Sequence, residues 1–326
     1  MGAKAQHTVP NLHLRNFAGT QPAGQVWTYD CVNGKSWSQI PEETGTSTHF
    51  YSVLKEDGTQ DTRIEELLSA NESRAAPVYK RLLGGEIPKI DTQARVYFAE
   101  FLAMMYVRTS GMRRMNAEIR SRGLQTLSFA YAQNEAAFNR LIRGVEKERG
   151  ETITPEIKEE VRAMMRDPSA YDVEIPKHMT LSALGVADKI APIVYNMKWS
   201  LGQPLSGFFI TGDSPVIRTV DPKTRHPALG DGGFKNKTAE LSFPLSTDLM
   251  LFTSWDEDAL SFGLLEREYV DALNELRAIH ADRFLYAHVE DRLIVDLAAK
   301  FGGTRPEIKF SGFGPSAVAK TTVSRK

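Results

Sequence analysis

Hydrophobic and polar positions follow two different periods along this chain. Near the N-terminus, β-forming and polar residues alternate through residues 25–30 (QVWTYD) and 35–40 (KSWSQI), with Asn33 and Gly34 between the two runs. Alternation with a period of two indicates strands, and Asn-Gly tolerates the positive φ of a tight turn. The pattern therefore predicts a β-hairpin here, followed by a third strand at residues 49–54.

The middle of the chain, residues 61–201, changes to apolar residues at spacings of three and four. This spacing is typical of helices with one buried face. The predicted helices cover residues 61–83, 91–108, 113–120, 134–149, 154–166 and 176–201. Pro77 is expected to kink or split the first of them. Apolar stretches such as residues 98–107 are too short to span a bilayer, so no membrane association is expected.

The C-terminal third returns to strand patterns. Strands are predicted at residues 205–211, 216–220, 238–243 and 249–253, a helix at 269–287, and a strand or short helix at 293–301. The last stretch, residues 302–326, is basic and poor in apolar residues, which predicts a disordered tail.

These patterns predict an α+β fold in which a mostly antiparallel sheet packs against a helical layer. The sheet takes strands from the N-terminal hairpin and from the C-terminal third. Because both ends of the chain then meet in one sheet, we expect a single domain over residues 1–301, whose helical middle (61–201) can protrude.

Composition narrows the class of protein. The hydrophobic share is 41% and the charged share 25%, as in ordinary globular proteins. The net charge of −1 gives no reason to expect bulk attraction to nucleic acid. Cys31 is the only cysteine, so no internal disulfide forms, and the first twenty residues contain no signal-peptide core. We therefore expect a cytoplasmic protein.

Common catalytic motifs are absent from the sequence. There is no GxxxxGK[ST] phosphate loop, no GxGxxG after a strand, no HExxH, no zinc-ligand spacing and no GxSxG elbow. This argues against P-loop hydrolysis, Rossmann redox chemistry and the common kinds of zinc catalysis.

The best single site candidate is Asp213, which follows an apolar strand in the segment FFITGDSPV (residues 208–216). Residues at strand ends are exposed on a rigid platform and recur in catalytic sites. Ser214 beside it is a candidate substrate-binding residue. The alternative is ordinary turn chemistry, in which the Asp213 carboxylate caps backbone N–H groups.

Two candidates lie in the N-terminal segment HTVPNLHLRNF (residues 7–17). His7 is a candidate general base or metal ligand, since histidine titrates near neutrality, or else it bonds to the backbone where the segment crosses the sheet. Arg15 either binds phosphate or carboxylate through its planar fork, or pairs with a buried acid such as Asp30. For His13 a structural or surface role is favoured.

Two further candidates lie on predicted helices. Arg108 ends the second helix and begins a run of basic residues, which either faces phosphates or forms a solvated helix face. Asn274 lies on an otherwise apolar helical stripe, and a buried amide needs polar partners. It is therefore a candidate substrate-binding residue.

Seven short motifs occur in order: HxVPxxxLRxF, a WxYD strand, an FYS strand, an FLAxxYxRT helix, FITxDxPV, FPLS and LNxxxxxxAxRxxYA. In this order the chain resembles the bacterial domain-of-unknown-function family DUF4238, over about residues 7–290. Residues 115–180 and the tail match no pattern of that family. The resemblance implies a shared fold and site but names no reaction.

Two classes of function follow from these candidates. The first is a hydrolase of phosphodiester or nucleotide-like substrates, a chemistry that would suit a role in bacterial defence. In it His7 and Asp213 are catalytic or bind Mg²⁺ or Mn²⁺, and Arg15 and Arg108 neutralise phosphate charge. The second is a non-catalytic ligand-binding or sensor protein, or a partner-binding component of a complex, in which the same groups only hold the fold together.

Overall fold

The computed structural model describes residues 5–20, 24–48, 50–51, 53–54, 59–226 and 230–302. They divide into two compact units. Unit 1 holds the described residues up to Arg113 and again from Leu181, and unit 2 is Arg114–Thr180. Unit 2 is shorter than the helical middle that the sequence pattern predicts, because the helices on either side of it belong to unit 1. From residue 303 onward the predicted tail lies outside the described residues.

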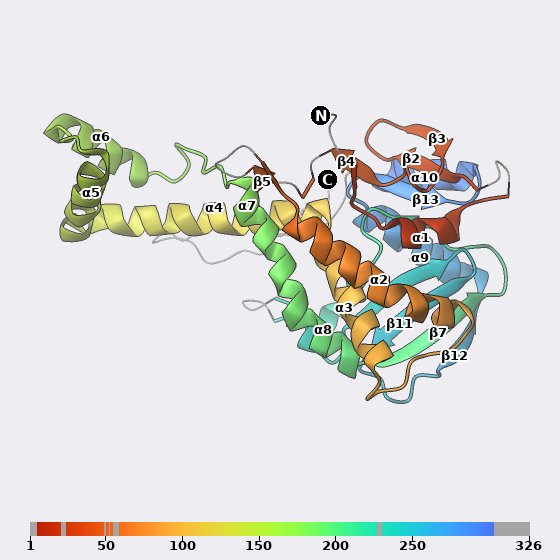
Figure 1. Cartoon of the computed structure of the whole chain (residues 1–326). Coiled ribbons are helices and arrows are strands. Elements are labelled where there is room, and N and C mark those ends of the chain that lie inside the picture. The colour runs from red at the N-terminus through yellow and green to blue at the C-terminus, as the bar shows by residue number, and fades with distance from the viewer. Residues whose placement is uncertain are drawn as a thin grey trace. The chain divides into compact units, whose positions relative to one another are not determined.

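Two sheets form most of the β-structure of unit 1 (Figure 1). One has the order β12-β7-β11-β10-β9, with β7 (Lys198–Pro204), β9 (Ile217–Thr219), β10 (Glu240–Ser246), β11 (Leu249–Ser254) and β12 (Phe262–Leu265). The other has the order β3-β2-β13-β8, with β2 (Val26–Asp30), β3 (Lys35–Gln39), β8 (Thr211–Gly212) and β13 (Phe284–Ala287). Within them only β12 and β7 pair in parallel.

The predicted α+β class is confirmed, as is the mostly antiparallel pairing. The N-terminal hairpin β2–β3 joins the C-terminal strand β13, which brings the two ends of the chain into one sheet as expected. Two short pairs complete the β-structure, namely β1 (Ala5–His7) with β4 (Thr46–Thr48) and β5 (Val53–Leu54) with β6 (Gln60–Asp61).

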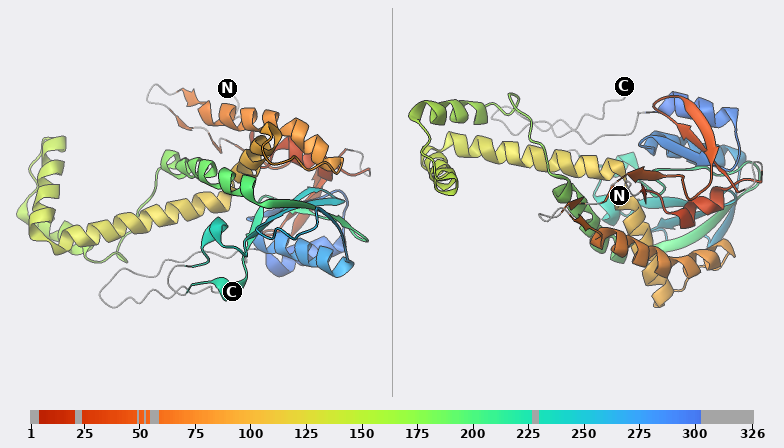
Figure 2. Two further views of the ribbon diagram at one scale, coloured as in Figure 1. Left: turned by 90° about the horizontal axis from the view of Figure 1, so that it is seen from below. Right: turned by 45° about the horizontal axis from the view of Figure 1, so that its top comes forward.

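Three helices cover one face of the five-stranded sheet: α2 (Arg63–Leu83), α3 (Gln93–Val107) and α8 (Ala187–Asn196). In both views of Figure 2 these orange, gold and green helices lie on the same side of the teal strands. Aromatic rings fill the layer between them, and Phe98 on α3 packs edge-on against Trp199 of β7. Pro77 lies inside α2, which continues through it.

The helix α9 (Arg267–His280) packs on the opposite face of this sheet. Val270 and Leu273 join Met250 and Phe252 of β11 in a buried cluster. The end of α9 joins β13 and α10 (Arg292–Phe301) in a second cluster, so α9 bridges the two sheets.

Two predicted helices are too long, because each runs into a strand. α8 ends at Asn196 and the chain continues as β7, where the buried Trp199 and Leu201 alternate with Ser200 and Gly202. Likewise α9 ends at His280, and the chain continues as β13. Both strands are fixed by pairing with distant parts of the chain, which a local helical spacing does not reveal.

A short helix, α1 (Asn11–Leu14), and the turn η1 (Arg15–Phe17) place the N-terminal segment in the core of unit 1. Unit 2 contains the part of α4 (Ser110–Gln133) beyond Arg113, together with α5 (Glu135–Arg149) and α6 (Pro155–Met165). Its own small core holds Ala132, Phe138, Ile142 and Met165. No helix among the described residues is both long and apolar enough to cross a membrane.

Candidate functional site

Asp213 follows the edge strand β8 and is bonded as a turn cap. One carboxylate oxygen accepts the N–H of Asp282 (2.7 Å), and the other accepts those of Arg283 (2.7 Å) and Phe284 (2.9 Å). Burial and the charge of Asp282 raise the pKa of Asp213 to about 7, against the lowering effect of these N–H donors. The carboxylate therefore fixes the turn into β13, which matches the structural alternative.

The Arg108 side chain is buried inside unit 1, whereas phosphate binding requires an accessible guanidinium. Its side chain is only 3% exposed. The guanidinium donates to Glu72 (2.7 Å), to the His7 carbonyl (2.7 Å) and to the Tyr51 hydroxyl (3.1 Å). The expectation of a solvated face is thus wrong for this residue, and phosphate binding stays a prediction that would require its guanidinium to leave these three bonds.

Neither His7 nor Arg15 joins Asp213 in a bonded cluster. His7 lies on β1, and its ring nitrogen Nε2 is buried without a hydrogen-bond partner among the described residues. Arg15 is exposed and pairs with Glu42 (2.7 Å). The alternative partner proposed for Arg15, Asp30, pairs instead with Arg283 (2.7 Å).

Asn274 is buried on α9 and its side chain hydrogen-bonds to the segment before β8. Its side-chain oxygen accepts the N–H of Ile210 (3.0 Å), and its amide donates to the Phe208 carbonyl (2.8 Å). Ser214 is buried beside a small cavity of about 50 Å³ that Arg218 and His280 also line. This volume suits one or two water molecules.

His13, for which the sequence favours a structural or surface role, is fully buried in a hydrogen-bond chain. The Tyr79 hydroxyl donates its single proton to the Leu245 carbonyl (2.7 Å), so it accepts from His13 Nδ1 (2.9 Å). His13 Nε2 then accepts from the Thr211 hydroxyl (2.8 Å). Burial, with a contribution from Arg277, lowers the pKa of His13 to about 3, so the ring is neutral.

Of the predicted site residues, Asp213, Arg108 and Asn274 are held in hydrogen bonds within the fold. Among the residues that the structure describes, no group of three or more His, Cys, Asp and Glu side chains is placed to hold a metal ion. Mg²⁺ often binds through one or two carboxylates plus substrate oxygens, so it does not need such a group. Binding of Mg²⁺ or Mn²⁺ therefore stays a prediction.

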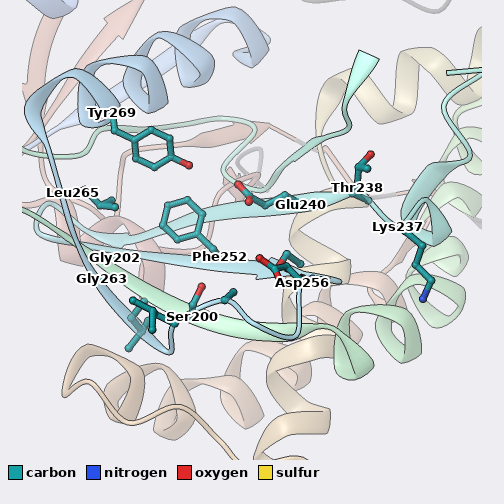
Figure 3. A pocket seen from close by; sticks show the side chains of 15 residues that line it. Ser200, Gly202, Lys237, Thr238, Glu240, Phe252, Asp256, Gly263, Leu265 and Tyr269 are labelled. Atoms are coloured by element: carbon teal, nitrogen blue, oxygen red, sulfur yellow. Dashed lines mark hydrogen bonds between the residues drawn. The ribbon is translucent and has the colours of Figure 1, made fainter. Parts of the chain in front are cut away.

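A groove of about 340 Å³ opens on the α9 face of the five-stranded sheet (Figure 3). Its floor follows from strand register. On β11, Phe252 lies opposite Ser200 of β7, and Ser254 lies opposite Glu240 of β10. Alternation puts these side chains on the face that carries α9. Because α9 covers only the Met250 end of this face, the other end stays open.

The walls of the groove come from three segments. Tyr269 stands on the first turn of α9, Asp256 follows β11, and Leu265 belongs to β12. The rings of Phe252 and Tyr269 lie 6.3 Å apart between centroids and are tilted by 32°. In Figure 3 the Tyr269 hydroxyl points toward Glu240.

Gly202 makes room for this arrangement. A Cβ atom at this position would lie 2.8 Å from both Phe252 Cε2 and Leu265 Cδ1. The absent side chain therefore lets the Phe252 ring and Leu265 approach the β7 backbone. Gly263, which also lines the groove, differs in that a Cβ there would meet no atom within 4 Å.

The groove carries an unneutralised acidic charge. Glu240 is half-buried, its carboxylate has no hydrogen-bond or ion-pair partner among the described residues, and burial raises its pKa. Burial, together with the charge of Glu240, also raises the pKa of Tyr269. Asp256 adds a second carboxylate on the exposed rim.

Local sequence patterns mark none of these groove residues as a site. Glu240 falls in a predicted strand and Tyr269 at the start of a predicted helix, but nothing local joins them. One signal was present, since Glu240 opens the otherwise uncharged strand ELSFPLS, where an acid needs a reason to be retained.

Comparison with protein families gave a match over most of the chain. The family model described as "protein of unknown function (DUF4238)" matches residues 5–291. No curated protein and no solved structure gave a significant match. The matched range covers both units and every residue of the groove. The chain belongs to the DUF4238 family.

Proposed function

We propose that this chain is a binding protein for a small organic molecule, which it holds in the groove on the five-stranded sheet. The observation that carries the proposal is the half-buried Glu240 carboxylate, which lacks a partner among the described residues and lies between aromatic walls. A buried charge without a partner destabilises a fold, so its retention is explained by a ligand that completes it.

Size and lining support the same proposal. Ligand pockets are commonly about 300–1,000 Å³, with apolar walls and a few polar groups that orient the ligand. The groove, at about 340 Å³, matches the lower end of this range. Phe252 and Leu265 supply apolar contact, and the hydroxyls of Ser200 and Ser254 supply polar contact.

The test is a ligand screen against matched glycine variants. Compounds from a chemically diverse fragment set are ranked by saturation-transfer NMR with the full chain, and hits are titrated by calorimetry. Gly202→Ala should abolish binding of groove ligands, because its Cβ displaces Phe252, whereas Gly123→Ala on α4, outside the groove and with no atom within 4 Å of the added Cβ, should keep binding. A screen without hits, or hits equally tolerant of both substitutions, would contradict a ligand site in the groove.

The hydrolase hypothesis stays a prediction with its own assay. Of its proposed residues, Asp213 and Arg108 are committed to structural bonds, Arg108 to the His7 carbonyl among others, and Arg15 pairs with Glu42. Incubation of the protein with DNA, RNA and nucleotides plus Mg²⁺ or Mn²⁺ decides the matter. Turnover by wild type that Asp213→Ala removes, with that variant still folded, would favour the hydrolase over the binding function.

A further inference from the structure

We infer that the ligand of the groove is a primary ammonium ion carried on an apolar, aromatic-sized carbon skeleton. This inference rests on the proposed binding function and names its ligand class. Four features of the groove carry it: the open carboxylate, the engagement of nearby cations elsewhere, the aromatic walls and the second acid at the rim.

The Glu240 carboxylate is oriented for a cationic donor. It starts β10, flanked in register by Ser254 on one side and Thr219 on the other, neither of which is charged. No described residue donates a hydrogen bond to it. A carboxylate accepts several hydrogen bonds, and an ammonium group offers three N–H donors. A primary ammonium ion is thus the simplest group that satisfies both its charge and its lone pairs.

Two lysines have to be considered, Lys237, which lines the groove, and Lys198 on β7, and both make contacts elsewhere. The Lys237 ammonium lies over the Trp255 ring, 4.4 Å from its centroid, and in Figure 3 its side chain points away from Glu240. Lys198 donates to the backbone carbonyl of Glu257 (3.4 Å). The contacts of these two lysines are with Trp255 and Glu257, so neither lysine is a counter-ion of Glu240.

The aromatic walls select for a cation with an apolar body. Phe252 and Tyr269 present ring faces and edges beside Glu240, and ring faces attract cations within about 6 Å. Leu265 extends the apolar wall. A flat hydrocarbon skeleton of about one ring would occupy this side of the groove while its ammonium reaches Glu240.

The rim argues against anionic ligands. Asp256 lies at the edge of the same groove, so a phosphate or carboxylate would meet two acidic side chains, while the lysine that lines the groove, Lys237, is held over the Trp255 ring. The acidic groove therefore favours an ammonium ion over the phosphodiesters considered as hydrolase substrates. Like charges at close range reduce affinity as strongly as the matched charge raises it.

Three compounds of nearly equal size test the inference: 2-phenylethylamine, its neutral analogue 2-phenylethanol, and the anion 3-phenylpropanoate. Each is titrated by calorimetry and saturation-transfer NMR into wild type, Glu240→Gln and Glu268→Gln. Glu268 lies one residue from Tyr269 on the exposed first turn of α9 but does not line the groove, which makes it a matched control. Unfolding curves establish that each variant is folded.

The amine should bind wild type at least tenfold more tightly than the alcohol, the ratio expected for a charge-assisted hydrogen bond, and the anion should bind weakest. Glu240→Gln should remove this preference, and Glu268→Gln should keep it. Equal affinity for amine and alcohol in wild type overturns the inference, as does an unchanged preference in Glu240→Gln. If neutral or anionic fragments bind the groove in place of amines, the ligand class is wrong and the binding function stands. If no fragment of any class binds, the binding function itself fails.

Discussion

Replacing Arg108 by methionine tests whether this residue is structural. Methionine keeps an unbranched chain in place of the aliphatic part of arginine but removes all three donated hydrogen bonds. The His7 carbonyl then loses a charged donor, and the Glu72 carboxylate, 26% exposed, loses its ion-pair partner. Breaking a buried pair of this kind costs about 3–5 kcal/mol of stability. We expect the loss to lie toward the lower value, because Glu72 regains some water.

The chain contains a matched control in Arg74→Met. Arg74 also pairs with a glutamate between α2 and α3, at 3.2 Å from Glu100, but these two side chains are more exposed, at 48% and 36%, than the 3% of Arg108 and 26% of Glu72. An exposed pair contributes about 0.5 kcal/mol or less. Each substitution therefore removes an arginine that pairs with a glutamate between α2 and α3, and the two pairs differ in burial.

The assay is urea unfolding followed by tryptophan fluorescence. All four tryptophans, Trp27, Trp37, Trp199 and Trp255, lie in unit 1, so the signal reports the unit that holds both pairs. If Arg108→Met and Arg74→Met shift the free energy of unfolding by equal small amounts, the structural assignment of Arg108 is refuted, and a ligand-binding role for it returns.

Three further outcomes are expected from the same unfolding assay. Asp213→Asn should cost about 1–3 kcal/mol of stability, because the amide nitrogen cannot accept one of the three backbone N–H groups, while Asp271→Asn on the exposed side of α9 should change little. An Asp213→Asn variant that keeps its stability but loses turnover of a nucleotide or nucleic-acid substrate would contradict the structural role of Asp213. His13 stays neutral in the fold to about pH 3 but is protonated near pH 6.5 when unfolded, so stability falls as the pH drops below 6.5. At pH 5 the loss from this residue is about 2 kcal/mol, and His13→Phe should lack it; parallel pH profiles would rule it out. The raised pKa of Glu240 acts with the opposite sign, since the folded state holds its proton longer and stability falls as the pH rises through that pKa. Glu240→Gln should therefore be more stable than wild type at pH 8 but not at pH 4, and a destabilised variant at pH 8 would mean that an internal cation partners Glu240.

Local patterns predicted much of the fold and little of the site. The hairpin around Asn33-Gly34 and the apolar helix α3 were predictable because their signals lie within a few residues. Strands β7 and β13 were hidden, because their partners β11 and β2 lie far along the chain.

The groove was not predictable from the sequence for a related reason. Asp213 and Arg108 are polar residues in prominent sequence positions, but prominence does not separate a catalytic group from a buried structural bond. Glu240 and Tyr269 carry no motif and meet only because α9 covers half of a sheet face. Such a site depends on where an element ends, which the sequence pattern fixes least well.

The long-range bonds of the N-terminal segment have a consequence for how the protein is made. Strand β2 pairs with β13, and His13 bonds to Thr211, so residues that leave the ribosome first bond to residues that leave it much later. Until residue 287 has emerged, the four-stranded sheet lacks its central strand β13, and β2 presents an unpaired edge. Unit 1 therefore completes its fold only after residue 287 has emerged, while unit 2, contained in residues 114–180, has all of its own core long before.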